Sequence, residues 1–177
     1  MKSFREFLNE GNPLSRLHSH IKSGRHFATL SAQRPVGEVT PEENIKRHKE
    51  LKHKLSQQGY QTKEVEGHWE GGKEKSILVY AKDTGEKSGR DLHRDMLQHG
   101  KDYNQDSILY HNGHKAKIHG TNEIGYPGKN NTKQIGKIHF NRPESENQTE
   151  MKPKSNNPLK PGRTSKANAR FDMSFKK

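Results

Sequence analysis

The chain has 177 residues, of which 25% are hydrophobic and 31% charged, which suits one small domain with appended segments better than two full domains. Its 33 lysines and arginines exceed its 21 aspartates and glutamates, and such an excess attracts polyanions through a sequence-independent, salt-sensitive interaction. The absence of cysteine excludes disulfides, thiolate zinc sites and thiol nucleophiles. No apolar run approaches the roughly 20 residues of a membrane helix, so we expect a soluble protein with no membrane partner.

Residues 1–10 predict a short amphipathic helix. Phe4, Phe7 and Leu8 share one face at i, i+3 and i+4 spacing, and the Gly11-Asn12-Pro13 sequence ends the helix. A helix this short does not persist alone in water, so its apolar stripe needs a surface on which to dock. We therefore expect residues 1–10 to act as a separate leader.

The clearest predicted element of the body is a helix that follows a short helix over 14–23 and a strand over 26–32. Thr40 is its predicted N-cap, Pro41 suits its first turn and Glu43 completes a capping box. Gly59 ends it, because glycine tolerates the left-handed conformation that often follows a helix. The residues that recur along one face of this helix are Ile45, His48, Leu51 and Leu55.

A second helix and five further strands are predicted after Gly59. The helix spans 88–103, and the strands span 60–66, 76–81, 107–110, 115–119 and 134–140, with a hairpin turn at Asn112-Gly113. The inward residues of the helix are Leu92, Met96 and Leu97. The order β-α-β-β-α-β-β-β predicts an α+β fold, in which a small mixed sheet carries two main helices on one face.

The chain therefore divides into the leader 1–10, an α+β domain over 11–140 and a tail over 141–177. The tail is rich in proline, asparagine, serine and lysine, and this composition predicts a flexible, extended, basic segment. Its positive charge predicts non-specific DNA binding. The predicted DNA-contact residues are Lys152, Lys154, Lys160, Arg163, Lys166 and Arg170.

The leader Met-Lys-Ser-Phe-Arg-Glu-Phe-Leu-Asn-Glu resembles the capsid-targeting peptides of internal head proteins in T-even-like phages. The resemblance implies that the head-maturation protease recognises Leu8 and Glu10 and cuts before Gly11. It also implies a contact with the prohead core and a location inside the virion, followed by the host cytoplasm after injection. The alternative is an ordinary N-terminal helix.

A second resemblance covers residues from about 27 to 120, which are similar to a bacterial and phage domain family of unknown function. The matching stretches are Ala32-Gln33-Arg34-Pro35, Pro41-Glu42-Glu43-Asn44, Gly59-Tyr60, Glu74-Lys75-Ser76 and Tyr103-Asn104-Gln105-Asp106-Ser107-Ile108-Leu109. The sequence departs from the family pattern at Gln33, where an acidic residue is common, and at Asn104, where glycine is common. The resemblance implies a fold but transfers no catalytic residues.

Polar residues of these stretches stand at the predicted ends of strands. Arg34 follows one strand, Glu74 precedes another, and Gln105 with Asp106 precedes a third. If they converge, they would hold a phosphate or nucleotide, with Arg34 as a bidentate anion clamp. The alternative, which we favour, is that Arg34 pairs with Glu43 or Glu74 and only fixes the loop.

Histidines around the predicted hairpin turn are the other candidates. His111, His114 and His119 form the densest group, and Asp106 would complete a divalent metal site or a nuclease-like centre. However, exposed histidines beside a tight turn are ordinarily solvated, and the sequence has no HExxH motif. We therefore favour neither catalysis nor metal binding here, and we expect no cofactor.

Three functions remain open after these observations. We favour a non-enzymatic internal head protein, packaged with phage DNA and injected to counter a host defence protein or another host factor. The alternative is an injected enzyme that acts on nucleic acids or nucleotides through Arg34, Glu74 and the histidines. A second alternative is a structural component of the head or scaffold core.

Overall fold

The computed structural model describes residues 19–69, 72–135, 148–151 and 169–172. Two long helices are present, α3 (Pro41–Gln57) and α4 (Glu86–Asp102), and residues 19–22 form a short helical turn. The strands are β1 (Phe27–Leu30), β2 (Gln61–Trp69), β3 (Gly72–Tyr80), β4 (Ser107–His111), β5 (Ala116–Gly120), β6 (Thr132–Gln134), β7 (Gln148–Met151) and β8 (Ala169–Asp172). The predicted α+β class is confirmed.

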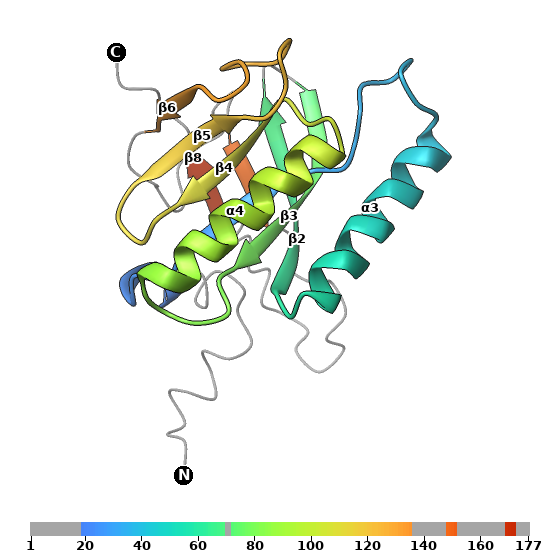
Figure 1. The fold of residues 1–177 in the computed structure, drawn as a ribbon. Coiled ribbons are helices and arrows are strands. Elements are labelled where there is room, and N and C mark those ends of the chain that lie inside the picture. The colour runs from blue at the N-terminus through green and yellow to red at the C-terminus, as the bar shows by residue number, and fades with distance from the viewer. Residues whose placement is uncertain (1–18, 70–71, 136–147, 152–168, 173–177) are drawn as a thin grey trace, which may run out of the picture.

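The described strands form one eight-stranded sheet with the order β6-β5-β4-β1-β3-β2-β7-β8. In Figure 1, α4 crosses in front of this sheet. Every pairing between these strands is antiparallel, so the expectation of a mixed sheet was wrong. The reason is that hairpins join β2 to β3 and β4 to β5, and a hairpin can join only antiparallel strands. Strand β1 lies in the middle, between β3 and β4.

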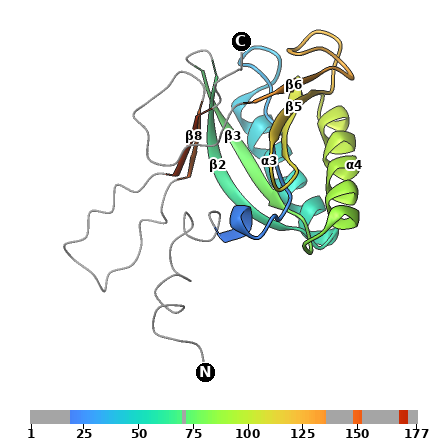
Figure 2. The ribbon, with the colours of Figure 1, turned by 90° about the vertical axis from the view of Figure 1, so that its left-hand side faces the viewer.

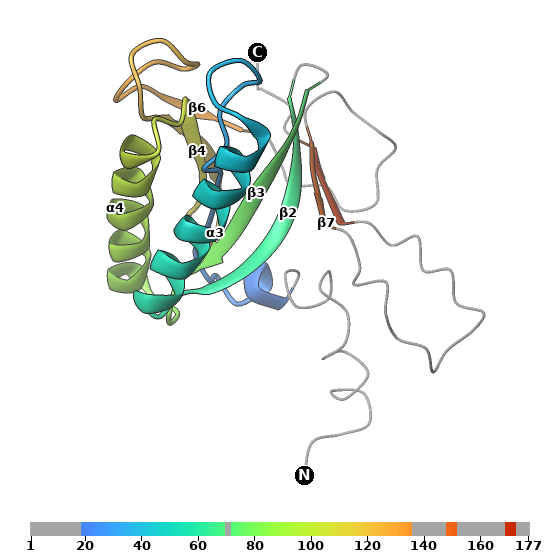
Figure 3. The ribbon, with the colours of Figure 1, turned by 90° about the vertical axis from the view of Figure 1, so that its right-hand side faces the viewer.

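Both long helices cover the same face of the sheet, as the two side views show (Figures 2 and 3). Alternate residues of the central strands point to this face and pack against the helices. The core residues are Ala28, Leu30, Ala32, Leu51, Leu55, Tyr60, Ile77, Val79, Ala81, Leu92, Met96, Tyr103, Ile108 and Tyr110. Among the described residues, no long helix lies on the opposite face of the central strands, and we call it the open face.

Helix α3 begins and ends where its sequence predicts. The Thr40 hydroxyl accepts a hydrogen bond from the Glu43 backbone N–H at 3.1 Å, and Gly59 follows the helix at a φ of 80°. The predicted inward face is shifted by one residue at its start, because Asn44 is buried whereas Ile45 is 49% exposed. Asn44 is buried because its amide binds the backbone of the preceding loop.

Two predicted boundaries differ from the structure. We expected a loop between residues 66 and 76, but β2 and β3 continue as a hairpin to Trp69 and Gly72. The backbone pairing of the hairpin outweighs the weak strand preference of its glycine and glutamate residues. Strand β6 covers Thr132–Gln134, whereas we expected 134–140, and residues 136–140 lie outside the described part.

The predicted tail contains two strands. Strand β7 pairs with β2, and β8 pairs with β7 at the edge of the sheet. No helix in the described ranges is long and apolar enough to cross a bilayer.

Candidate functional site

A pocket of about 610 Å³ lies on the open face of the sheet, a size that suits a small-molecule ligand. Its floor is formed by alternate residues of neighbouring strands, and its rim by the segment that leads into α3 and by the segments beside β4 and β5. The lining residues are Thr29, Leu30, Ser31, Gln33, Arg34, Pro35, Val36, Val39, Pro41, Asn44, Ile45, Gly67, Lys73, Glu74, Ser76, Gln105, Asp106, Ser107, Leu109, Ile118 and Tyr126.

Glu74 provides a carboxylate on the floor of this pocket. It lies opposite Gly67 in the β2–β3 hairpin, and solvent reaches it through the open pocket. Surrounding protein atoms desolvate the carboxylate and raise its pKa, and Ser31 and Ser76 oppose this effect by hydrogen bonding. The charge of Asp106 also raises the pKa, whereas Arg34 lowers it. Glu74 is therefore a partly desolvated acid that a cationic ligand would stabilise in its ionised form.

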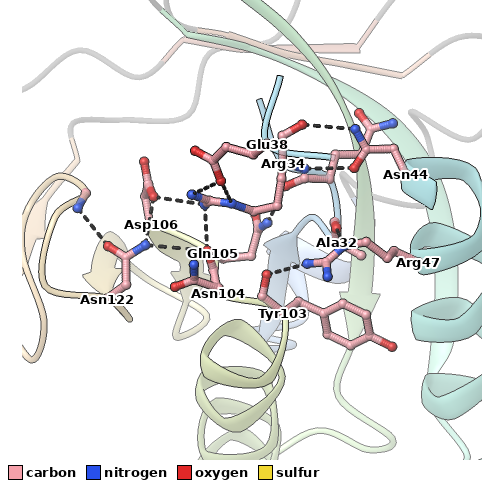
Figure 4. Close-up of polar contacts among 12 residues, drawn as sticks. Ala32, Arg34, Glu38, Asn44, Arg47, Tyr103, Asn104, Gln105, Asp106 and Asn122 are labelled. Atoms are coloured by element: carbon pink, nitrogen blue, oxygen red, sulfur yellow. Dashed lines mark hydrogen bonds and ion pairs between the residues drawn. The ribbon is translucent and has the colours of Figure 1, made fainter. Parts of the chain in front are cut away.

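Arg34 connects its own loop to the segment before β4 at the rim of the pocket (Figure 4). Its Nε and Nη2 atoms both lie 2.8 Å from a Glu38 carboxylate oxygen. Its Nη1 donates to the Asn104 carbonyl oxygen at 2.6 Å and lies 3.3 Å from Asp106. The partners of Arg34 are therefore Glu38 and Asp106, and the expected pairing with Glu43 or Glu74 was wrong. The guanidinium is occupied by protein groups, which leaves little capacity to clamp a ligand anion.

The rim segment 33–38 is also held through its backbone. Asn44 accepts a hydrogen bond from the Arg34 N–H and donates to the Arg34 carbonyl, at 2.8 and 2.9 Å. The Gln105 side chain donates to the Gln33 carbonyl at 2.7 Å, and the Gln33 side chain accepts from the Lys75 N–H at 2.9 Å. These bonds join the segment after β1 to α3, to β3 and to the segment between α4 and β4.

Asp106 is held from the opposite side by the segment that follows β5. The Asn122 side-chain amide donates to Asp106 at 2.8 Å, and its Oδ1 accepts from the Gly125 N–H at 2.7 Å (Figure 4). Gly125 packs so closely on Asp106 that a Cβ atom there would lie 2.2 Å from the Asp106 Cβ. Asp106 is thus fixed between Arg34 and Asn122, and 58% of its side chain stays exposed.

The hairpin histidines do not join this pocket. His119 lies on the helix-covered face, where its Nδ1 is 3.3 Å from His93 Nε2. His111 shares the open face but stacks on Phe27 at the far end of β4, and its Nδ1 accepts from the Gly113 N–H. The His114 backbone N–H donates to Asn112 in the turn. Of the residues that we considered from sequence, the structure brings together Arg34, Glu74, Gln105 and Asp106.

Two of the hairpin histidines, His111 and His119, are less solvated than we expected, whereas His114 is exposed as expected. Burial lowers the pKa of both His111 and His119 to about 4, with smaller contributions from neighbouring positive charges. In the described ranges, no three side chains of the histidine, cysteine, aspartate and glutamate types are grouped to hold a metal ion. Asp106 lies at the other end of β4 from His111, which separates the ligands that we had considered together.

Several predicted sites fall outside the described residues. The processing residues Leu8, Glu10 and Gly11 are among them, as are Lys152, Lys154, Lys160, Arg163 and Lys166. Arg170 belongs to β8, where only the backbone is described. The predicted cleavage and DNA contacts stay predictions.

The pocket lies in a part of the chain that matches a known protein family. Residues 28–157 match the model of the S-adenosylmethionine lyase family, and this range contains every residue that lines the pocket. The chain belongs to the S-adenosylmethionine lyase family. A search of curated proteins found no match.

Membership in this family overturns the prediction of a non-enzymatic phage head protein. That prediction depended on the similarity of ten N-terminal residues, whereas the family match covers most of the chain and its pocket. The expectation that the body belongs to a recognised domain family was correct. The expectation that this family has no known activity was wrong, because the family is named for a reaction.

Sequence reasoning missed several residues of the pocket. Three missed residues line the floor: Ser31, Gly67 and Ser76. The alternation of residues along β1, β2 and β3 could have predicted them, because they lie on the same face of the sheet as Glu74. Asn122 and Tyr126 belong to a loop and follow no periodic pattern. Their places are set by hydrogen bonds that only the folded chain reveals.

Proposed function

We propose that the protein is an S-adenosylmethionine lyase whose active site is the pocket on the open face. The observation that carries the proposal is the partly desolvated carboxylate of Glu74 in a pocket of about 610 Å³, within a chain of this family. S-adenosylmethionine has two cationic groups, a sulfonium and an ammonium. A partly desolvated carboxylate suits such a ligand, because the bound cation compensates the cost of desolvating the acid.

The balance of charge in the pocket supports a cationic ligand. Arg34 is paired with Glu38 as well as with Asp106, so Glu74 and Asp106 together exceed the positive charge that Arg34 supplies. Lys73 also lines the pocket but has its own acidic partner, Glu66, at 3.6 Å. We expect Glu74 and Asp106 to attract the two cationic groups of the substrate, although the whole chain is strongly basic.

The reaction class follows from the chemistry of the sulfonium. A lyase breaks a carbon–sulfur bond without water, and the sulfur leaves as a neutral thioether that requires no proton. Of the three carbons on sulfur, only the aminobutyryl Cγ has a carboxylate in its own chain. A carboxylate oxygen attacks Cγ as the Cγ–S bond breaks, so the amino-acid part is released as homoserine lactone and no proton is gained or lost. The released thioether is 5′-methylthioadenosine. Because positive charge disappears in this step, the apolar walls at Leu109 and Ile118 favour the transition state over the bound cation.

The role of Glu74 is therefore binding and orientation of the cationic substrate. We expect the purified full-length chain to convert S-adenosylmethionine to 5′-methylthioadenosine, measured by chromatography. Glu74→Gln should lower kcat/KM by about 10- to 100-fold, mainly through KM, because a charge-assisted interaction of about 1.5–3 kcal/mol is lost.

Glu64→Gln is the matched control for this experiment. Glu64 is an exposed strand glutamate that pairs with Lys52 at 2.8 Å and does not line the pocket, so its variant should keep the wild-type rate. A folded protein that leaves S-adenosylmethionine intact would refute the proposed reaction. Equal activity of wild type and Glu74→Gln would refute the role of this carboxylate.

A further inference from the structure

The segment 121–131, which joins β5 to β6, reaches the pocket rim and places Tyr126 in its lining. Tyr126 is the only aromatic side chain among the described residues that line the pocket. It is 47% exposed, so much of its surface stays open to a ligand. Its position brings a flat aromatic ring to a pocket that also holds the carboxylate of Glu74.

The segment is held firmly at its start. Thr121 binds the last residues before β4, through its N–H to the Asp106 carbonyl at 2.9 Å and through its hydroxyl to the Gln105 carbonyl. Asn122 then binds Asp106 and Gly125 as described above. Tyr126 follows Gly125 directly, so the bonds that fix Asp106 also fix the approach of this ring to the pocket.

The far side of the segment is equally constrained. The Gly120 N–H donates to the Asn131 carbonyl at 2.9 Å, and the Asn131 side chain donates to the Pro127 carbonyl at 3.1 Å. Gly120 and Gly128 touch so closely that a Cβ atom on Gly120 would lie 1.9 Å from the Gly128 carbonyl oxygen. A ring on a segment held at both ends is preorganised, which reduces the entropy lost when a ligand binds.

We infer that Tyr126 is the platform on which the adenine of the substrate stacks. The inference rests on the proposed function, which supplies the adenosyl group. A purine offers a flat π-face, and aromatic side chains bind such faces by stacking. Glu74 and Asp106 attract the cationic amino-acid end, so the two ends of the substrate are recognised by different chemistry. Tyr126 then determines the preference for an adenosyl sulfonium over a sulfonium amino acid that has no base.

The test measures recognition of the adenine separately from recognition of the cationic amino-acid end, because it uses a ligand that has the adenine alone. 5′-Methylthioadenosine carries the adenine and no charge, and its Kd is measured by calorimetry on the full chain. Tyr126→Leu should raise this Kd and the KM for S-adenosylmethionine by about tenfold, whereas Tyr126→Phe, which keeps the ring, should stay within about twofold of wild type. Glu74→Gln should raise the KM but leave the Kd for 5′-methylthioadenosine unchanged.

Ile124→Ala is the matched control. Ile124 is 99% exposed in the same segment and does not line the pocket, so both constants should keep their wild-type values. Circular dichroism verifies that each variant is folded.

Wild-type affinity of a folded Tyr126→Leu variant for 5′-methylthioadenosine would overturn the inference, as would an active wild type that fails to bind this compound. Binding that depends on Tyr126 in a protein that does not cleave S-adenosylmethionine would support the adenine platform and refute the proposed reaction. Cleavage with no effect of Tyr126 would refute only the platform.

Discussion

Glu74 illustrates how neighbouring groups set the chemistry of one side chain. Glutamates on the same hairpin, such as Glu64, have partners at the surface, and the Lys52 ammonium lowers the pKa of Glu64. Glu74 points to the open face, where desolvation and the charge of Asp106 raise its pKa instead. The pKa values of these two glutamates of the same hairpin are thus shifted in opposite directions.

The raised pKa predicts a pH dependence of the proposed reaction. As the pH falls through the raised pKa, Glu74 takes up a proton and loses the charge that attracts the substrate, so kcat/KM should decline at a pH above the ordinary glutamate pKa of about 4.3. The bound cation lowers this pKa again, so kcat should decline only at a lower pH. Rate profiles of both constants test this, and identical profiles for wild type and Glu74→Gln would contradict it.

The residues of the pocket differ in how far the sequence predicts them. Arg34, Glu74, Gln105 and Asp106 stand beside strands, so their convergence could be considered from the sequence alone. The ion pair between Arg34 and Glu38 could not be predicted from the sequence, because the conformation of the loop 35–39, and not a periodic pattern, brings Glu38 to Arg34. Tyr126 shows no signal of its own, because its place depends on the Asn122 bonds to another segment.

At the scale of elements, the absence of a side chain at Gly89 lets α4 pack closely against the sheet. Gly89 is buried, and a Cβ atom there would lie 2.0 Å from His26 Nδ1. The same His26 nitrogen lies 2.6 Å from the Tyr110 hydroxyl oxygen, and the Tyr110 hydroxyl donates its proton to the Gly89 carbonyl at 3.0 Å. The missing side chain at Gly89 therefore lets a strand, a helix and the residue before β1 meet in one hydrogen-bonded group.

Gly89→Ala should consequently destabilise the protein, although alanine is favoured over glycine in a helix by about 1 kcal/mol. The displaced His26 ring should cost about 1–3 kcal/mol in the free energy of unfolding, measured by urea denaturation. In a His26→Ala background the overlap is absent, so the same change should be neutral or stabilising. A stabilising effect in the wild-type background would show that the ring moves without cost.

The elements themselves were largely predictable from the sequence. Capping and periodicity located α3 and α4, because Thr40 and the buried Leu92 and Met96 follow local rules. Ile45 was misplaced because periodicity cannot distinguish a core position from a pocket wall, and both are apolar. The β2–β3 hairpin was underestimated because its stability comes from pairing with a distant part of the sheet as well as from its own residues.

At the scale of the whole molecule, the histidines dominate the response to acid. Among the described residues, six histidines have a pKa below the ordinary value, with burial as the largest cause in each case: His26, His48, His93, His99, His111 and His119. They belong to both faces of the sheet and to both long helices. Each is held neutral in the folded chain and gains a proton more readily when the chain unfolds.

We therefore expect stability to decline with acid. The contribution of a histidine with a lowered pKa is fully present above its unfolded pKa of about 6.5, and it is lost as the pH falls toward the folded value. For His111 and His119, whose pKa is about 4, the window runs from about pH 6.5 to about pH 4. Each should contribute on the order of 1–3 kcal/mol to the decline, measured by urea unfolding across this range. His111→Gln and His119→Gln should flatten the curve, and curves parallel to wild type would contradict the assignment.

The central place of β1 has a consequence for how the chain folds during synthesis. This strand leaves the ribosome first, yet its two partners are the segments Ile77–Tyr80 and Leu109–His111. Until both have emerged, one or both edges of Phe27–Leu30 lack a hydrogen-bonding neighbour, and such edges are prone to pair with other chains. Contacts between distant segments also slow folding. Ser31, Glu74 and Asp106 come from these same three regions, so a nascent chain acquires its pocket only after residues beyond β4 have been made, and a substrate cannot bind before the fold is nearly complete.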